Sequence, residues 1–359
     1  MHTKLLVGTS KGLIILSNEK SWSISSVQFE GFSISLVYVD ERTNTWWVGV
    51  SHRHWGEKLH RSEDEGKTWK EISVPTYIDH LYSPGEPAFL RKMWVLQHAG
   101  VDRPGGLWLG TEPGGLFFTN DNGNSFQLNE SLWNHPSRQD SKQWFGAGKD
   151  YPFIHSIVID PRDSNHIYIA VSCAGIFETL DGGKSWNARN TGLIAAYLPN
   201  PQAEVGHDPH RLLLCAKTPD VLWQQNHCGI FRSVNGASSW EEVSGADGFP
   251  KYGFALAVDE NDPLTAWVIP AHSDEQRIPV GLKVAVCKTT DGGKTWRSVS
   301  KGLPNSNAFD LTLRHSFVKK ESTLVFGTNN GNLYLSTDKG ESWETISMNL
   351  PMINYIAFA

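Results

Sequence analysis

Histidine is the residue type in this sequence with the most evident potential for chemistry. The 359 residues include 14 histidines, and neutral imidazoles together with one or two carboxylates are good ligands for Zn, Mn, Fe or Cu. The candidate metal ligands stand near the starts or ends of expected strands: His155, His210, His227 and His272. The sequence contains no HExxH motif, so a metal site needs ligands from separate segments of the chain.

Acidic, basic and aromatic residues in similar positions complete the candidate site. Glu112 is a candidate metal ligand or general base, and Arg53 or Arg277 is a candidate anchor for an anionic group of a substrate. The candidate substrate-binding residues are His54, Trp55, Trp144, Asp274 and Glu275. With a metal ion, this set would polarise a substrate or activate water for hydrolysis or elimination. The alternative for each single histidine is an ordinary hydrogen-bonding or packing role.

The elements that must position these residues are short β-strands. Fifteen tryptophans and 33 glycines, with only 4 methionines, suit strands whose aromatic side chains pack between sheets and whose turns need positive φ. A hydrophobic content of 39% and a charged content of 19% exclude a disordered chain. No apolar run approaches 18 residues, which excludes a transmembrane helix.

One eight-residue pattern recurs along the chain, and we call each copy a box. Five copies keep the pattern Ser/Thr-x-Asp-x-Gly-x-Ser/Thr followed by Trp or Phe. They occupy residues 62–69, 119–126, 179–186, 289–296 and 336–343, with their aspartates at Asp64, Asp121, Asp181, Asp291 and Asp338. Degraded copies occupy residues 17–22 and 233–240. The recurrence therefore divides the chain into seven units.

Each box is typical of a hairpin turn. The hydroxyl and carboxylate side chains bond local backbone amides, the glycine takes the left-handed conformation, and the aromatic residue begins the next strand. The pattern resembles the Asp-box (BNR) repeat of sialidases, sortilin-type receptors, xyloglucanases and photosystem II assembly factors. That resemblance implies that the boxes are structural and lie on the face opposite the ligand site.

Period-2 alternation around the boxes predicts four strands in each unit. The innermost strands are expected at Ser33–Asp40, Met93–His98, His155–Asp160, Arg211–Ala216, Tyr252–Asp259 and Asp310–His315. Only two strands, Leu5–Thr9 and Leu13–Ser17, precede the first box, so the C-terminal segment Ile353–Phe358 is expected to supply the missing inner strand. The prediction is an all-β, seven-bladed β-propeller that forms one domain over residues 1–359 and is closed by combining its two termini.

Four long insertions interrupt the regular units, and chain direction assigns them all to the rim opposite the boxes. They are Val74–Leu90, Gln127–Ile154, Thr191–Pro209 and Ala271–Gly281. Long loops on a rigid scaffold commonly carry function, so the site is expected on this rim. Trp133, Trp55 and Trp144 lie there as candidate sugar-stacking platforms, whereas Trp47, Trp108 and Trp267 fit strand patterns and are expected to pack between blades.

Three functions remain as alternatives. The first is a histidine-rich pocket for a small polar or carbohydrate-like ligand, with metal-dependent hydrolase or lyase activity. The second is a sialidase-like glycoside hydrolase, although sialidases have six blades and the Arg277-Ile278-Pro279 sequence lies in the sixth unit rather than near the start. A xyloglucanase would need two propellers in tandem. The third is a non-catalytic scaffold that holds a protein partner.

Charge and cysteine content limit the partners and the compartment. The formal net charge of −6 provides no positive field for nucleic acid or anionic lipid. Residues 1–9 lack the charged segment, the long apolar segment and the small-residue cleavage site of a secretory signal. The four cysteines form no CxxC pair. We therefore expect reduced thiols, a cytoplasmic protein, no organic cofactor, and no nucleic-acid or membrane partner.

Overall fold

The computed structural model describes residues 4–139, 143–146 and 148–359. The prediction that the chain has no secretory signal refers in part to residues 1–3, which lie outside the described residues. Contacts between Cα atoms divide the chain into two compact units. Unit 1 comprises residues 1–34 and 210–359, and unit 2 comprises residues 35–209. The single-domain assignment over residues 1–359 stays a prediction.

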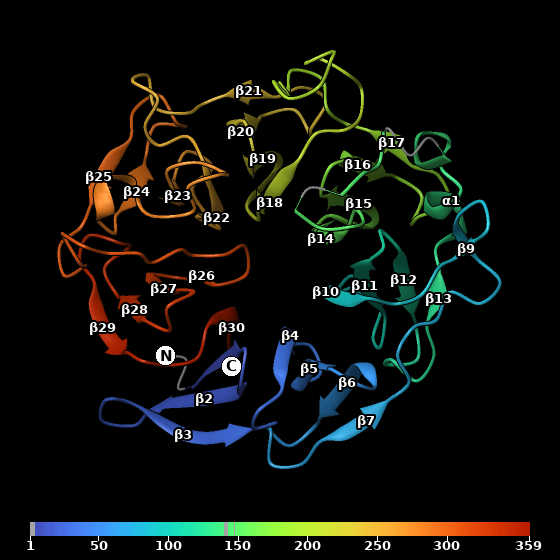
Figure 1. The fold of residues 1–359 in the computed structure, drawn as a ribbon, viewed down its shortest axis with the longest axis horizontal. Coiled ribbons are helices and arrows are strands. Elements are labelled where there is room, and N and C mark those ends of the chain that lie inside the picture. Colours follow the sequence, from blue (N-terminus) through green and yellow to red (C-terminus); the bar gives the residue numbers. More distant parts are fainter. Residues whose placement is uncertain (1–3, 140–142, 147) are drawn as a thin grey trace. The chain divides into compact units, whose positions relative to one another are not determined.

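Unit 2 contains three four-stranded antiparallel sheets (Figure 1). In chain order their strands are β4 (Ser33–Asp40), β5 (Thr45–His52), β6 (Gly56–Ser62) and β7 (Lys70–Ile72); β10 (Lys92–His98), β11 (Leu107–Glu112), β12 (Leu116–Thr119) and β13 (Gln127–Leu128); and β14 (Ile154–Asp160), β15 (Asp163–Val171), β16 (Gly175–Thr179) and β17 (Asn187–Ala188). In each sheet, hydrogen-bonded neighbours follow the chain order.

Unit 1 contains four sheets of the same kind. Their strands are β1 (Lys4–Thr9), β2 (Gly12–Asn18), β3 (Trp22–Gln28) and β30 (Ile353–Phe358); β18 (Pro209–Cys215), β19 (Thr218–Asn226), β20 (Gly229–Ser233) and β21 (Glu241–Glu242); β22 (Gly253–Val258), β23 (Ala266–Pro270), β24 (Val286–Thr289) and β25 (Arg297–Val299); and β26 (Phe317–Lys320), β27 (Thr323–Gly327), β28 (Leu333–Ser336) and β29 (Glu344–Ser347). Seven four-stranded blades confirm the predicted β-propeller fold class.

The C-terminal strand completes the first blade, as the sequence predicted. Strand β30 pairs antiparallel with β1, so that Val7 lies opposite Ile356 and Leu6 opposite Ala357. Val7 and Ile356 are buried in one hydrophobic cluster with residues of β28. The two ends of the chain are therefore joined by backbone hydrogen bonds and by apolar packing.

The boxes form one repeated hydrogen-bonded turn. In the box of residues 62–69, Ser62 Oγ accepts from the Gly66 amide at 2.8 Å, and the Asp64 carboxylate accepts from the Thr68 hydroxyl at 2.7 Å and the Thr68 amide at 2.8 Å. The Thr68 hydroxyl, followed by the Thr68 amide and the Ser62 hydroxyl, lowers the pKa of Asp64 to about 2. Equivalent bonds surround Asp121, Asp181, Asn235, Asp291 and Asp338.

Tryptophans on second strands pack beneath the box glycines of the following blade. A Cβ added to Gly123 would lie 2.7 Å from the Trp47 ring, and one added to Gly183 would lie 3.1 Å from the Trp108 ring. Trp47, Trp108 and Trp267 are all at most 2% exposed. Their predicted role in packing is confirmed, and the glycine is needed because its turn has positive φ and a close aromatic neighbour.

One inner strand was predicted at the wrong place. The expected strand Asp310–His315 is not a strand, and the blade begins instead at β26 (Phe317–Lys320). Hydrogen bonds to a loop hold the expected segment: Asp310 Oδ1 accepts from Thr328 Oγ1 at 2.8 Å, and the Leu311 amide donates to Asn329 Oδ1 at 2.7 Å. Polar and apolar residues alternate in this segment as they do in a strand. Hydrogen bonds with side chains of the loop nevertheless replace the backbone ladder that a strand would form.

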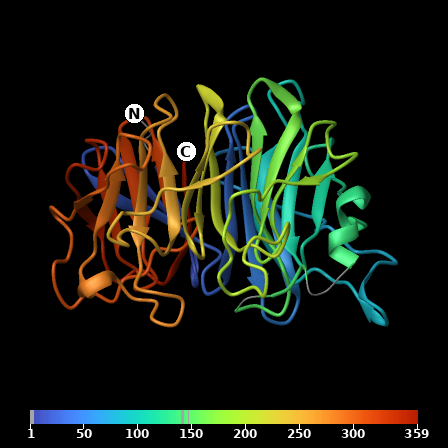
Figure 2. The same cartoon turned by 90° about the horizontal axis from the view of Figure 1, so that it is seen from above.

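The insertions contain the few elements outside the blades. The insertion after β7 forms a small hairpin of β8 (Leu81–Ser83) and β9 (Glu86–Pro87), and the insertion after β13 forms α1 (Glu130–Trp133) and the 3₁₀-helix η1 (Pro136–Gln139). Figure 2 shows α1, in green, beside the strands of unit 2. A further 3₁₀-helix, η2 (Val280–Leu282), lies in unit 1. None of the helices in the described ranges has the length and hydropathy that a membrane crossing requires.

Candidate functional site

Two of the predicted metal ligands come together in unit 1. His210 lies on β18, and His227 lies in the turn between β19 and β20. Their ring centroids are 5.7 Å apart, and one possible ligand atom from each lies within 4.8 Å of the other. A single ion can therefore be reached from both imidazoles after small side-chain adjustments.

The His210 ring is held in a defined orientation. Its side chain is 1% exposed, stacks on Phe254 with ring centroids 4.5 Å apart, and places Nδ1 2.6 Å from the Gly253 carbonyl oxygen. Because a carbonyl oxygen only accepts, Nδ1 donates the proton in this bond. The neutral ring then carries its lone pair on Nε2, the arrangement that proteins use to orient an imidazole for metal binding.

Polar groups from two further elements border the histidine pair. The Tyr252 ring packs edge-on at 5.6 Å from both imidazoles, and its hydroxyl donates to Asp274 Oδ1 at 3.3 Å. Arg277 Nη2 donates to the same oxygen at 2.6 Å. Burial alone would raise the pKa of Asp274, but the hydrogen bond and charge of Arg277 and the charge of His227 lower it. An ionised carboxylate therefore lies near the two imidazoles.

The other predicted residues of this loop, like Asp274 and Arg277, are exposed. His272 follows Ala271 and uses its backbone amide to bond the Ile278 carbonyl at 2.8 Å, while its side chain is exposed. The Glu275 side chain is exposed as well. Of the residues predicted in unit 1, the structure thus brings together His210, His227, Asp274 and Arg277. We call these four residues, with Tyr252, the histidine cluster.

His155 belongs to unit 2 and has a different environment. It is fully buried in β14, with Nδ1 3.0 Å from Ser156 Oγ and Nε2 2.8 Å from the Pro209 carbonyl oxygen. Both ring nitrogens are therefore engaged by protein groups. Asp208, two residues before His210 in the sequence, also belongs to unit 2, where it accepts from Ser172 Oγ at 2.7 Å.

Glu112 ends strand β11 in unit 2. It is 6% exposed and accepts from Trp94 Nε1 at 3.2 Å. Desolvation raises its pKa, and the charge of Lys149 and the Trp94 hydrogen bond oppose that rise. A carboxyl group with a raised pKa can donate or accept a proton in catalysis; the role of Glu112 as metal ligand or general base stays a prediction.

The predicted aromatic and basic rim residues divide between surface and core. Arg53, His54 and Trp55 form the exposed turn between β5 and β6, and Trp55 is 74% exposed. Trp144 is 2% exposed and donates from Nε1 to Ser137 Oγ at 3.0 Å. Trp133 is 4% exposed, so Trp55 is the most accessible of the three candidate stacking platforms.

Several residues of interest were not predicted as site residues. Tyr252 and Phe254 shape the histidine cluster, but the sequence indicated only that they begin an inner strand. Arg138, buried on η1, was not singled out either. The available signal was its place between Trp133 and Trp144 in a long insertion, since arginine commonly stacks on aromatic faces.

The comparisons with known proteins support the fold and a distant relationship. No family model matches the chain. It is 24% identical over 228 residues to a probable oligoxyloglucan-reducing end-specific xyloglucanase of Neosartorya fischeri, a match that covers 55% of this chain and 26% of the relative. The chain thus spans about a quarter of the length of that enzyme.

Solved structures show the same propeller fold at low identity. A GH74 enzyme of Niastella koreensis matches with a TM-score of 0.55 and 14% identity, over 98% of this chain and 65% of the enzyme. The protein YCF48 bound to a D1 peptide matches with a TM-score of 0.52 and 16% identity, over 87% of this chain and 80% of that protein. The chain is therefore a β-propeller similar to xyloglucanase and YCF48 propellers.

Proposed function

We propose that the protein binds a small polar, carbohydrate-like ligand at the histidine cluster, through a divalent transition metal held by His210 and His227. The observation that carries this proposal is the fixed orientation of His210, whose Nδ1 donates to the Gly253 carbonyl and whose ring stacks on Phe254. Zn, Mn, Fe and Cu all accept neutral imidazole ligands.

The remaining groups of the cluster suit a polar ligand. Tyr252 supplies a hydroxyl and Asp274 a carboxylate, and the partial exposure of Asp274 and Arg277 leaves them within reach of a ligand. A bound ion would polarise a ligand oxygen or lower the pKa of water. Hydrolysis or elimination would follow from that chemistry, with Asp274 as the proton acceptor.

Glycoside hydrolysis is the second candidate, and the name of the xyloglucanase relative favours it. Hydrolysis by the usual route needs two carboxyl groups on either side of the glycosidic bond. The histidine cluster contains a single carboxyl group, that of Asp274. We therefore propose carbohydrate binding without the xyloglucanase type of hydrolysis.

The repeated box turns support membership of the Asp-box (BNR) family.

Metal analysis tests the primary proposal. Protein purified without a histidine tag, equilibrated with Zn²⁺ and gel-filtered, should retain about one equivalent, while His227→Gln should retain less than about a tenth. His227 is the better target because His210 is fully packed. His80→Gln is the matched control, since its histidine contacts Glu130 in unit 2. Wild-type protein with less than about a tenth of an equivalent, or equal retention by His227→Gln, would contradict the proposal.

Calorimetric titration with xyloglucan oligosaccharides, with and without Zn²⁺, tests the ligand class. Binding that needs both the metal and His227, without release of reducing sugar, is expected. Reducing-sugar release that survives the His227→Gln substitution would favour a glycoside hydrolase at another site.

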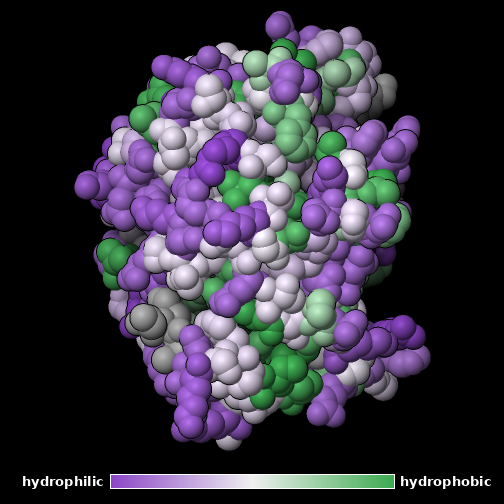
Figure 3. Space-filling view, turned by 90° about the vertical axis from the view of Figure 1, so that its left-hand side faces the viewer, coloured by the Kyte–Doolittle hydropathy of each residue, from purple (hydrophilic) through white to green (hydrophobic). Residues whose placement is uncertain are grey.

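A non-catalytic scaffold is the third alternative, in keeping with the peptide-bound YCF48 structure. The side of the molecule that carries β25 and β29 has mainly hydrophilic residues, with hydrophobic residues in small groups (Figure 3). Such a surface gives little area for an apolar partner. A protein that copurifies in stoichiometric amounts, without metal uptake, would favour this alternative.

The proposed cytoplasmic location is supported by the four cysteines, all of which are thiols.

A further inference from the structure

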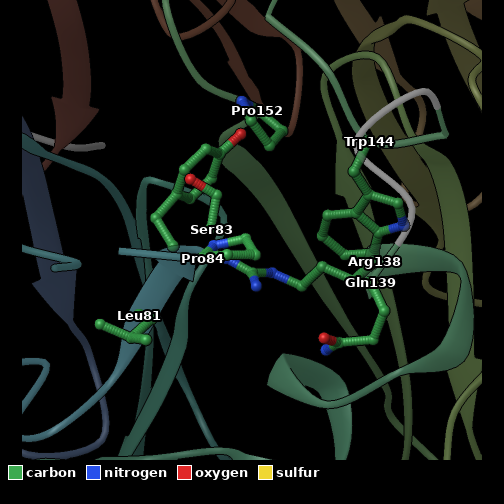
Figure 4. Close-up of a pocket in the computed structure, with 8 residues that line it drawn as sticks. Leu81, Ser83, Pro84, Arg138, Gln139, Trp144 and Pro152 are labelled. Atoms are coloured by element: carbon green, nitrogen blue, oxygen red, sulfur yellow. The ribbon is translucent and has the colours of Figure 1, made fainter. Parts of the chain in front are cut away.

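Unit 2 contains a pocket of about 450 Å³ formed by two of its insertions, Val74–Leu90 and Gln127–Ile154. Tyr82 and Ser83 line it from the β8–β9 hairpin, and Arg138 and Gln139 line it from η1. Figure 4 shows Arg138 extending from η1 towards Ser83 and Pro84, with Trp144 and Pro152 at the border. A volume of this size suits a compact small molecule.

Arg138 is the most unusual group in this pocket. Only 8% of the residue is exposed, and its guanidinium carbon lies 3.3 Å from the centroid of the Trp133 ring. The rings of Tyr82 and Trp144 lie 5.7 Å and 5.9 Å from the same carbon. The cation is thus surrounded by aromatic faces, which attract it through their negative potential.

The aromatic rings do not replace the hydrogen bonds that this cation has lost. Nε and Nη2 of Arg138 are buried, and neither has an acceptor within the described part of the chain. Desolvation lowers the pKa of Arg138 to about 10, and the phenols of Tyr77 and Tyr82 oppose part of this decrease. A buried cation with no counter-charge among the described residues is costly. Arg138 lines the pocket, so an anion that contacts its guanidinium would offset part of that cost.

We infer that this pocket binds a compact organic monocarboxylate, with the carboxylate at Arg138 and a flat, mainly apolar body between the hairpin and Pro152. The inference does not rest on the histidine cluster, which lies in the other unit. The walls from Leu81, Pro84 and Trp144 are apolar and suit a ring. Arginine is the residue best suited to bind carboxylates, because its donors form a fixed fork.

A carboxylate on the hairpin, bonded to the pocket residue Ser83, disfavours a second negative charge on the ligand. Ser83 Oγ donates to Glu86 Oε2 at 2.9 Å, and Tyr151 donates to the other oxygen of Glu86. The hydrogen bond from Tyr151, and then that from Ser83, lowers the pKa of Glu86. Glu86 is therefore ionised on the hairpin side of the pocket and would repel a second anionic group.

Calorimetry of the wild-type protein with benzoate, acetate and sulfate tests this inference. Benzoate should raise the unfolding temperature in a saturable manner, beyond sodium chloride of equal ionic strength, because a ligand of the native state stabilises it. Acetate should bind more weakly, since it lacks the ring. Equal saturable responses to sulfate and benzoate would overturn the assignment of an organic body, and the absence of any saturable benzoate response would overturn the pocket itself.

Substitution of the arginine locates the binding. Arg138→Gln should weaken benzoate binding by about tenfold or more, as expected for loss of a charge-assisted hydrogen bond. Arg103→Gln removes the same charge from a residue that bonds Asn165 elsewhere in unit 2, and should leave binding unchanged. Equal affinities of Arg138→Gln and wild type would refute the role of Arg138. If Arg138→Gln does not fold, the wild-type titration remains decisive.

Discussion

Two buried tryptophans allow a quantitative test of how neighbouring blades are held together. Trp267 and Trp108 occupy second strands, and each packs against the box glycine of the following blade: an added Cβ would lie 2.9 Å from Trp267 Nε1 at Gly340 and 3.1 Å from the Trp108 ring at Gly183. Both side chains are at most 2% exposed. They differ in the indole N–H.

The hydrogen bond sets the expected difference between Trp267→Phe and Trp108→Phe. Trp267 Nε1 donates to the Lys339 carbonyl at 3.0 Å, whereas the buried Trp108 Nε1 has no acceptor among the residues that the structure describes. Replacement by phenylalanine removes a similar amount of buried aromatic surface at both sites. Trp267→Phe also loses a hydrogen bond worth about 1 kcal/mol. Trp108→Phe instead removes an unsatisfied donor that costs about 1–3 kcal/mol.

Trp267→Phe should therefore lower the free energy of unfolding by at least about 2 kcal/mol more than Trp108→Phe. Urea unfolding followed by far-UV circular dichroism measures this difference from the midpoints at an unchanged slope. The Lys339 carbonyl still accepts from Lys288 Nζ at 3.1 Å, which keeps the expected loss moderate. Equal losses, or a larger loss for Trp108→Phe, would refute the assignment of the difference to the indole hydrogen bond.

Three further predictions concern the box, a buried ion pair and the thiols. The pKa of Asp121 is about 2, lowered from 3.8 chiefly by the hydrogen bond from the Ser125 hydroxyl. Its contribution to the stability of the folded protein is therefore complete above pH 3.8 and is lost as the pH falls towards 2. Asp121→Asn should remove this dependence and destabilise less than Asp121→Ala in thermal unfolding, because Asn235 already makes the same turn; equal losses at neutral pH would contradict this. Burial alone would lower the pKa of His166, but Glu178 and Asp160 raise it above 6.5. The contribution of His166 to stability is therefore complete below pH 6.5 and is lost as the pH rises through its pKa in the folded protein. His166→Gln should flatten that part of the profile of unfolding free energy against pH, measured by urea titration. An unchanged profile would exclude this ion pair as the cause. Finally, iodoacetamide and peptide mass spectrometry should find Cys228 modified in the native protein and Cys287 protected, since burial raises the pKa of the Cys287 thiol to about 12; early labelling of Cys287 would disprove the protection.

Much of the fold could be predicted because its signals are local. A box is complete within eight residues, as the bonds among Ser62, Asp64 and Thr68 show, so its geometry follows from the sequence of the turn itself. The closing strand was predicted from a count of strands, and the pairing of Val7 with Ile356 confirms it. The error at Asp310 arose where distant side chains replaced a strand ladder.

The candidate site was less predictable because side-chain roles depend on contacts between distant segments. His155 and His210 had similar positions in their strands. The structure engages both nitrogens of His155 with Ser156 and Pro209, and it bonds His210 Nδ1 to the Gly253 carbonyl, 43 positions away, which orients the ring. Ser156 is adjacent to His155 in the sequence, but the Pro209 and Gly253 carbonyls lie 54 and 43 positions from the histidines that they bond, so local sequence could not predict these contacts.

The sequence by itself determined the number of blades, the turn in each box and the strand that joins the two ends, because each is encoded by local spacing and by alternation of side chains. Only the tertiary structure decided which polar groups find partners. It brings His210, His227 and Tyr252 together, and it buries Arg138 against Trp133 without an acceptor among the described residues. The physical reason is that burial and hydrogen bonding are fixed by the packing of separate insertions and blades, which no single segment specifies.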